Sequence, residues 1–149
     1  MIASGMAASR STGSKLFVPT FLSHLAMAHA QLGQLDEARP LIDEAIAALE
    51  TTKERLWEAE VHRLAGEIAR FERDAGKAED SFRRALVVAK RQQAKSWELR
   101  AATSLARLWR DVGRRAEAHD LLAPVYGWFT EGFDTLDLKQ AKALLGELA

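Results

Sequence analysis

Apolar residues recur along this chain at steps of three and four positions, the spacing that places them on one face of an α-helix. Alternation of apolar and polar residues, which would indicate strands, is nearly absent. The pattern predicts helices separated by short turns, and no sheet. The expected helices run from about Phe17 to Leu32, Asp36 to Thr51, Arg55 to Arg73, Lys77 to Gln93, Ser96 to Val112, Arg115 to Thr130, and Thr135 to Leu148.

Several helix ends are expected at specific residues. Gly33 and Gly113 follow the first and fifth helices, and glycine readily takes the left-handed conformation that closes a helix. The pair Ala75-Gly76 is expected to separate the third helix from the fourth, and Ser96 to cap the fifth.

The sixth helix contains Pro124, which removes one backbone hydrogen bond and is unfavourable within a helix by about 3 kcal/mol. We therefore expect a kink there. Tyr126, Trp128 and Phe129 are expected to pack over the bend and onto the last helix.

The same residue types recur at a spacing of forty positions. Trp57 and Trp97 occupy one such position, with Phe17 before them, and are expected to pack between repeats. Fixed columns of small and large residues indicate helical hairpins that stack on one another. The columns are Ala26, Gly66 and Ala106; Ala38, Ala78 and Ala118; Ala45, Ala85 and Val125; and Ile42, Phe82 and Leu122. The prediction is an all-α fold, a right-handed α-solenoid.

Gly66 lies inside its predicted helix, where glycine is less favourable than alanine by about 1 kcal/mol. We expect glycine at this position because a larger side chain would push the two helices of the hairpin apart. The expected organisation is a disordered leader over 1–14 and a repeat domain over 15–149. Its units are 15–54, 55–94 and 95–134, followed by a capping helix over 135–148.

These columns resemble the tetratricopeptide repeat, which has a small residue in its first helix and alanine, a large apolar residue and alanine in its second. The unit here is forty residues long rather than about thirty-four. The stretch from Ala94 to Leu148 also resembles the C-terminal repeat region of bacterial signalling proteins that carry cyclase and ATPase domains. The resemblance implies a helical interaction module and supplies no catalytic residue.

The composition limits the class of protein. Of 149 residues, 48% are hydrophobic and 28% charged, and the net charge is zero, values typical of a globular domain. The absence of cysteine excludes disulfides and thiol chemistry and agrees with a reducing, cytoplasmic location. No apolar run approaches the roughly eighteen residues of a transmembrane helix.

Candidate chemistry is scarce. No phosphate-binding loop is present, and His24 and His29 are five residues apart, a spacing that does not suit a zinc site. His62 is expected to be a partly buried, hydrogen-bonded residue, and Glu58 and Glu98 to pair with neighbouring helices. Trp109 fits either the core or the wall of a groove. We predict no catalytic residue, metal or cofactor, and a protein that is not an enzyme.

Charge is unevenly distributed, with thirteen basic and six acidic residues between Arg70 and Arg115. In tetratricopeptide arrays the first helix of each hairpin lines the concave face, which here becomes basic toward the C-terminus. In the third helix, pairing with Glu60 and Glu67 is the favoured interpretation; for the fifth helix, pairing and ligand binding stay equally open. The candidate groove residues are Arg63, Arg70, Arg100, Thr103, Arg107 and Arg110.

The leading hypothesis is a binding module, part of a larger signalling system, that takes an acidic protein segment or peptide in this groove. A homodimer is the alternative, in which a second copy covers Phe17, Val18 and Phe21. A remote alternative is nucleic-acid binding by the basic 70–115 stretch; the zero net charge and the lack of base-stacking motifs argue against it. No membrane partner is expected.

Overall fold

The computed structural model describes residues 18–52 and 55–149. Within these ranges the chain forms seven α-helices and no strand, which confirms the predicted all-α helical-repeat solenoid. The expected leader over 1–14 and Phe17 lie outside the described residues. The helices are α2 (Val18–Gln31), α3 (Leu35–Thr52), α4 (Glu58–Phe71), α5 (Ala75–Arg91), α6 (Lys95–Asp111), α7 (Arg115–Gly127) and α8 (Leu136–Leu148).

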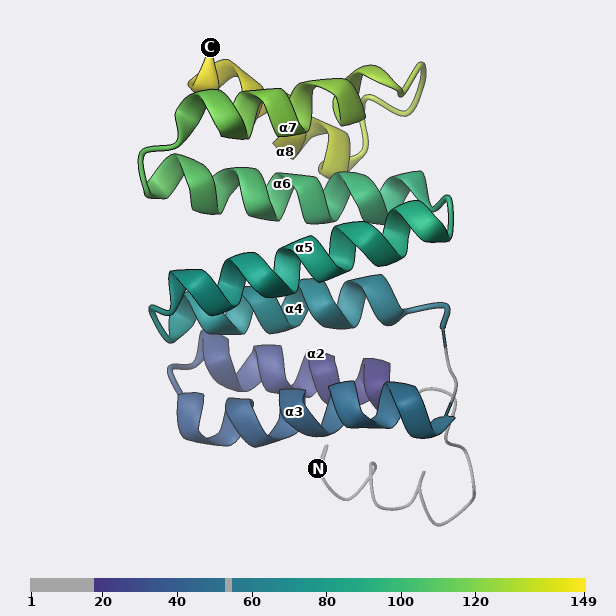
Figure 1. The fold of residues 1–149 in the computed structure, drawn as a ribbon, viewed down its shortest axis with the longest axis vertical. Helices are drawn as coiled ribbons and strands as arrows, with labels where there is room; N and C mark the ends of the chain where they lie inside the picture. Colours follow the sequence, from purple (N-terminus) through teal and green to yellow (C-terminus); the bar gives the residue numbers. More distant parts are fainter. Residues whose placement is uncertain (1–17, 53–54) are drawn as a thin grey trace.

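The helices form a stack of antiparallel hairpins, α2–α3, α4–α5 and α6–α7, with α8 at the C-terminal end (Figure 1). Each first helix contacts the first helix of the next hairpin, and α8 contacts α6 in the same way. Among the described residues, α3, α5 and α7 do not contact one another. The first helices therefore form the closer, inner layer of the stack, and α8 takes the place of a further first helix in it.

At four of the turns, the helix is closed by a residue in the left-handed backbone conformation. Gly33, Arg73, Gln93 and Gly113 have φ values of 79°, 62°, 55° and 87°. The residue after each one donates its backbone N–H to a carbonyl five positions back, as in the hydrogen bond from Gln34 to His29 of 2.8 Å. This geometry satisfies carbonyl groups that would otherwise lack a partner at the helix end.

The expected break at Ala75-Gly76 is wrong, because both residues lie in the first turn of α5. The turn comes earlier, at Arg73, and the Asp74 carboxylate accepts a hydrogen bond of 3.0 Å from the backbone N–H of Lys77. An aspartate that caps the helix decides its start, whereas glycine is tolerated in the first turn.

The expected cap at Ser96 is also wrong, because α6 begins at Lys95 and Ala94 is its N-cap residue. Ala94 has no side-chain acceptor. The left-handed turn at Gln93 sets where α6 begins. The preference for serine as a capping residue does not decide this helix start.

Helix α7 passes through Pro124 and ends at Gly127, before the predicted end at Thr130. Tyr126 and Phe129 pack against the core as expected. Trp128 does not, since it is 57% exposed. Its indole ring instead lies beside the Lys95 ammonium group, 5.3 Å from Nζ to the ring centroid, at the start of α6.

The core follows the columns of small and large residues. Seven column alanines and the three large residues Ile42, Phe82 and Leu122 are completely buried. The clearest close approach is at Gly66, where an added Cβ would lie 2.4 Å from Cε1 of Phe82. Glycine is therefore required because the Phe82 ring of α5 occupies the space beside α4. The buried alanines are Ala26, Ala38, Ala45, Ala78, Ala85, Ala106 and Ala118.

The repeated tryptophans join neighbouring hairpins, as predicted. The rings of Trp57 and Trp97 meet edge to face, with centroids 5.3 Å apart at 71°. Trp109 belongs to the core rather than to a groove wall: it is buried, and its Nε1 donates to Oε1 of Glu79 at 2.9 Å.

We predict that Gly66→Ala lowers the free energy of unfolding by about 1–3 kcal/mol, because overpacking against Phe82 outweighs the better helix propensity of alanine. Urea denaturation measures this change. The matched control is Gly146→Ala in α8, where an added Cβ has nothing within 4 Å. That variant is expected to be neutral or stabilised by up to about 1 kcal/mol. Equal effects of the two substitutions would contradict the packing explanation.

Candidate functional site

The predicted groove residues come from α4, where they are seven positions apart, and from α6, where they follow steps of three and four. Because these helices are adjacent in the inner layer, their arginines lie on one surface, which we call the arginine face: Arg63, Arg70, Arg100, Arg107 and Arg110. Thr103 lies among them but is buried, and its hydroxyl donates to the Leu99 carbonyl of the same helix at 2.8 Å.

One buried carboxylate organises the first part of the arginine face. Glu60 is 4% exposed and accepts hydrogen bonds from Arg63, 2.6 Å from Nε to Oε1 and 3.0 Å from Nη2 to Oε2. Nη1 of Arg100, on the next first helix, lies 2.7 Å from Oε2 of the same carboxylate. Glu60 thus neutralises two arginines and joins α4 to α6.

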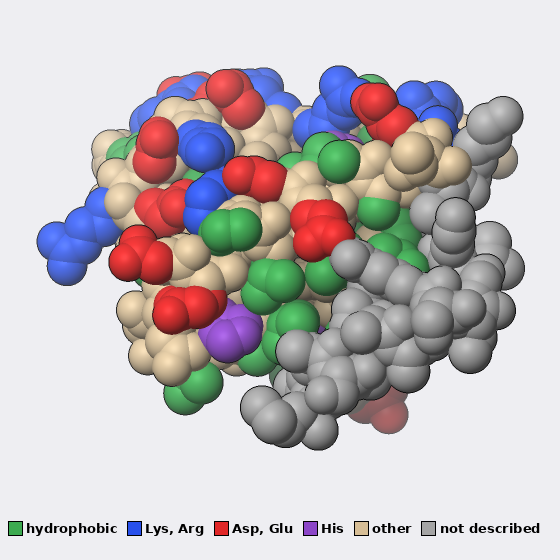
Figure 2. All heavy atoms as spheres, turned by 90° about the horizontal axis from the view of Figure 1, so that it is seen from below, with side chains coloured by type: hydrophobic (Ala, Val, Ile, Leu, Met, Phe, Trp, Pro, Cys, Tyr) green, Lys and Arg blue, Asp and Glu red, His purple; other side chains and the backbone are tan. Residues whose placement is uncertain are grey.

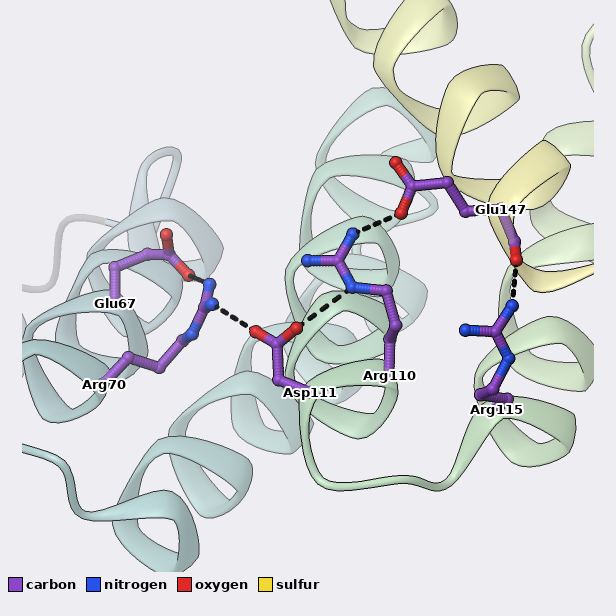
Figure 3. Close-up of polar contacts among 6 residues, drawn as sticks. All are labelled: Glu67, Arg70, Arg110, Asp111, Arg115 and Glu147. Atoms are coloured by element: carbon purple, nitrogen blue, oxygen red, sulfur yellow. Dashed lines mark hydrogen bonds and ion pairs between the residues drawn. The ribbon is translucent and has the colours of Figure 1, made fainter.

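A chain of ion pairs crosses the other end of the face, shown in Figure 3. Arg70 contacts Glu67 at 3.4 Å and Asp111 at 2.9 Å. Asp111 also contacts Arg110 at 3.0 Å, and Arg110 continues to Glu147 of α8 at 2.7 Å. The chain therefore runs through α4, α6 and α8. Arg115 of α7 donates to the Glu147 backbone carbonyl.

Arg107 differs from the other arginines. Among the described residues it makes no ion pair or hydrogen bond, although it is partly buried between these two groups. Burial lowers the pKa of Arg107 below its ordinary value, and the charge of Glu67 only partly opposes this. The positive charges of Arg70, Arg110 and Arg63 lower it further. An arginine stays charged under these conditions, so Arg107 keeps donors that are not used.

Arg107 opens onto a small cavity of about 150 Å³ between α4, α6 and α8. Ser104, Asp137 and Gln140 also line it, and the Asp137 carboxylate lies 3.5 Å from Nε of Arg100. Sequence analysis missed these three residues. The contribution of α8 could not be found from the sequence, because no local signal says which first helix a capping helix contacts.

The structure shows which of the arginines have carboxylate partners, whereas ligand binding by them stays a prediction. Pairing within α4 is confirmed for Arg63 with Glu60 and for Arg70 with Glu67. Arg100 and Arg110 are also paired, but with residues that include Asp137 and Glu147 of α8. The few acidic neighbours in the sequence therefore underestimated their partners in space.

The expected hydrogen bond of His62 is wrong, because this residue makes none within the described residues, whereas Glu58 is paired as expected. Glu58 is buried and lies 3.5 Å from Arg55 and 3.4 Å from Arg91, as expected for pairing with a neighbouring helix. Burial, together with the positive charge of Arg84, lowers the pKa of His62 to about 4 against the opposing charge of Glu58. In the described ranges no group of three or more His, Asp or Glu side chains could hold a metal ion.

The N-terminal end of the stack is formed by α2 and α3. Hydrophobic side chains gather on this end, as Figure 2 shows. Phe21 and Leu32 of this hairpin region are exposed, whereas Val18 is buried against its own hairpin. Of the residues expected to meet a second copy, Phe21 is thus the one described as exposed, and self-association stays a prediction.

These features define the class of protein as a helical-repeat solenoid with a charged inner surface. The tetratricopeptide repeat family model matches residues 17–91, about half of the chain, and the protein belongs to this family. Tetratricopeptide repeats generally mediate protein–protein interaction and scaffolding and are typically non-catalytic. No curated protein matches the chain. None of the helices in the described ranges combines the length and hydropathy needed to cross a membrane.

We predict that Glu60→Gln lowers the free energy of unfolding by about 2 kcal/mol or more, because it leaves Arg63 and Arg100 without their shared counter-charge. Urea denaturation at neutral pH measures the loss. Glu117→Gln is the control, since this exposed carboxylate pairs with Arg114 where solvent screens the charges. A control variant as unstable as Glu60→Gln would show that burial is not the cause.

His62 is expected to make stability depend on pH. The folded protein keeps it neutral down to pH about 4, whereas the unfolded chain protonates it below its ordinary value of 6.5. The unfolded state therefore binds more protons in this interval. Acidification destabilises the fold by about 2 kcal/mol near pH 5 and by up to roughly 3 kcal/mol in total.

The measurement is urea denaturation at about pH 7.5 and about pH 5. His62→Leu, which carries the residue found at Leu22 in the first hairpin, is expected to lose most of the difference. His119→Gln, at a half-exposed position, is the control and should keep this pH dependence. The same pH dependence in His62→Leu would exclude His62 as the source.

Proposed function

We propose that this protein is a protein-interaction module that binds an acidic segment of a partner on the arginine face, with Arg107 as the main anchor. The observation that carries the proposal is the unequal state of the five arginines. Four have carboxylate partners within the chain, and Arg107 has none among the described residues. A partner carboxylate would supply the missing charge.

The surroundings of Arg107 favour a carboxylate. Its guanidinium group is partly removed from water, and charge-assisted hydrogen bonds are stronger where water is excluded. A cavity of about 150 Å³ accommodates one side chain rather than a separate small molecule. The Ser104 hydroxyl and the Gln140 amide line the same cavity and can donate to a second carboxylate oxygen.

The paired arginines have a different role in this proposal. Glu60, Asp111 and Glu147 hold Arg100, Arg70 and Arg110 in fixed positions around Arg107. Fixed side chains lose less conformational entropy when a ligand binds. The arginine face is thus organised before the partner binds. Its specificity is for one acidic side chain, placed beside Arg107.

The resemblance of the Ala94–Leu148 stretch to repeat regions of bacterial cyclase- and ATPase-containing proteins supports a regulatory setting. In that setting the module would recruit a partner to a signalling system in the cytoplasm. The basic 70–115 stretch offers less support for nucleic-acid binding, because many of its arginines already have carboxylate partners.

A fluorescein-labelled peptide of six glutamates tests the proposal, with fluorescence anisotropy as the measurement. Arg107→Gln is expected to weaken binding about tenfold, the size of one charge-assisted hydrogen bond, and Arg107→Glu to abolish it. Lys77→Gln removes the same charge from an exposed position on α5 and should change binding less than about twofold.

A peptide of six lysines should not bind. Thermal unfolding of each variant must match the parent protein, since Arg107 has no partner to lose. If Arg107→Gln and Lys77→Gln weaken binding equally, the interaction depends on net charge alone and the proposed anchor is wrong.

A further inference from the structure

We infer that the junction between the α2–α3 and α4–α5 hairpins is a second binding site, for a small organic phosphate monoester. The junction contains a cavity of about 750 Å³, within the usual size range of small-molecule sites. Its walls come from the end of α3, the start of α4, and α5, on a different part of the stack from the arginine face. This inference is independent of the proposed protein-binding function.

The cavity wall combines apolar and basic groups. Ile46 and Leu49 of α3 supply an apolar surface, and Arg84 and Arg91 of α5 supply guanidinium groups. Arg91 reaches the buried Glu58 carboxylate at 3.4 Å, whereas Arg84 makes no ion pair among the described residues. The Glu50 carboxylate and Arg55 also line the cavity, so its arginines outnumber its glutamates.

His62 gives the strongest indication of a ligand. It is 9% exposed, it lines this cavity, and it makes no hydrogen bond within the described residues. Neither ring nitrogen of His62 is enclosed without a hydrogen bond, so the imidazole reaches the open cavity and can bind a ligand there. A neutral imidazole has one N–H donor, which can point to an anion held by the arginines.

The next junction along the stack shows which of these residues the repeat itself requires. Forty positions later, Glu98 takes the place of Glu58 and Lys95 that of Arg55, and the two lie 3.3 Å apart. This pair of residues therefore recurs at both junctions. The other polar residues have no such counterpart: His62, Arg84, Arg91 and Gln92 correspond to Ala102, Pro124, Glu131 and Gly132.

The next junction also contains a cavity, of about 650 Å³, lined by residues that include Lys95, Glu98 and Trp128. A cavity at the junction between two hairpins is thus a general feature of the stack and does not by itself indicate a ligand. The imidazole and the two guanidinium groups belong to the first junction only, and a packing role common to the repeats does not account for them.

The donor set favours a phosphate monoester. Arg84, Arg91 and His62 come from two helices and offer donors to three terminal oxygens, whereas a carboxylate has two. Ile46 and Leu49 then contact the apolar part of the same molecule. The expected ligand is therefore an amphipathic anion of roughly mononucleotide size or smaller.

The test is an NMR titration of the ¹⁵N-labelled full chain with phenyl phosphate, with benzoate and benzylamine in parallel. Phenyl phosphate is expected to shift the amide signals near His62, Arg84 and Arg91, and to bind at least about fivefold more tightly than benzoate. Benzylamine should cause no shift. Arg84→Gln is expected to weaken phenyl phosphate binding about tenfold.

Lys90→Gln is the matched control, because Lys90 is an exposed residue of α5 that lines the next junction instead. It should leave the affinity within about twofold of the parent. The inference is overturned if phenyl phosphate causes no localised shifts, if benzoate binds equally well, or if the two variants have equal effects. None of these results bears on the glutamate peptide, which is tested at Arg107.

Discussion

The structure depends on how closely the two helices of a hairpin approach each other. The Phe82 ring of α5 lies where a side chain at position 66 of α4 would stand, and only glycine leaves that space free. Buried alanines have the same role in the neighbouring columns. Because interiors are close-packed, these small residues fix the separation of the helices and hence where every other side chain of α4 and α6 lies.

This packing also determines the electrostatics of the inner layer. With α4 and α6 adjacent, one Glu60 carboxylate serves arginines from both helices, and α8 brings Asp137 and Glu147 to the same surface. A buried charge is tolerated only with an opposite charge beside it. Most arginines of the arginine face therefore join the helices of the stack through their carboxylate partners. Arg107 is the exception among the described residues of this face, and it carries the proposed function.

Both proposed sites lie where the chain departs from what its repeat requires. The columns of alanine, the Trp57–Trp97 contact and the Glu58 and Glu98 positions recur because each junction needs them. His62 and Arg84 do not recur at the next junction, where Ala102 and Pro124 stand in their places. In a repeat protein this contrast separates residues that hold the stack together from residues that are free to bind.

The sequence by itself determined the helical hairpins, their order and the packing columns, because helix periodicity and the size of a side chain are local properties that repeat every forty residues. It failed at the start of α5 and α6, where a capping aspartate and a left-handed turn decide the boundary. The spacing also predicted the pairs within α4, Arg63 with Glu60 and Arg70 with Glu67. Only the tertiary structure decided that Arg100 and Arg110 are paired across helices. Their carboxylate partners come from helices up to about forty residues away, and an ion pair depends on distance in space.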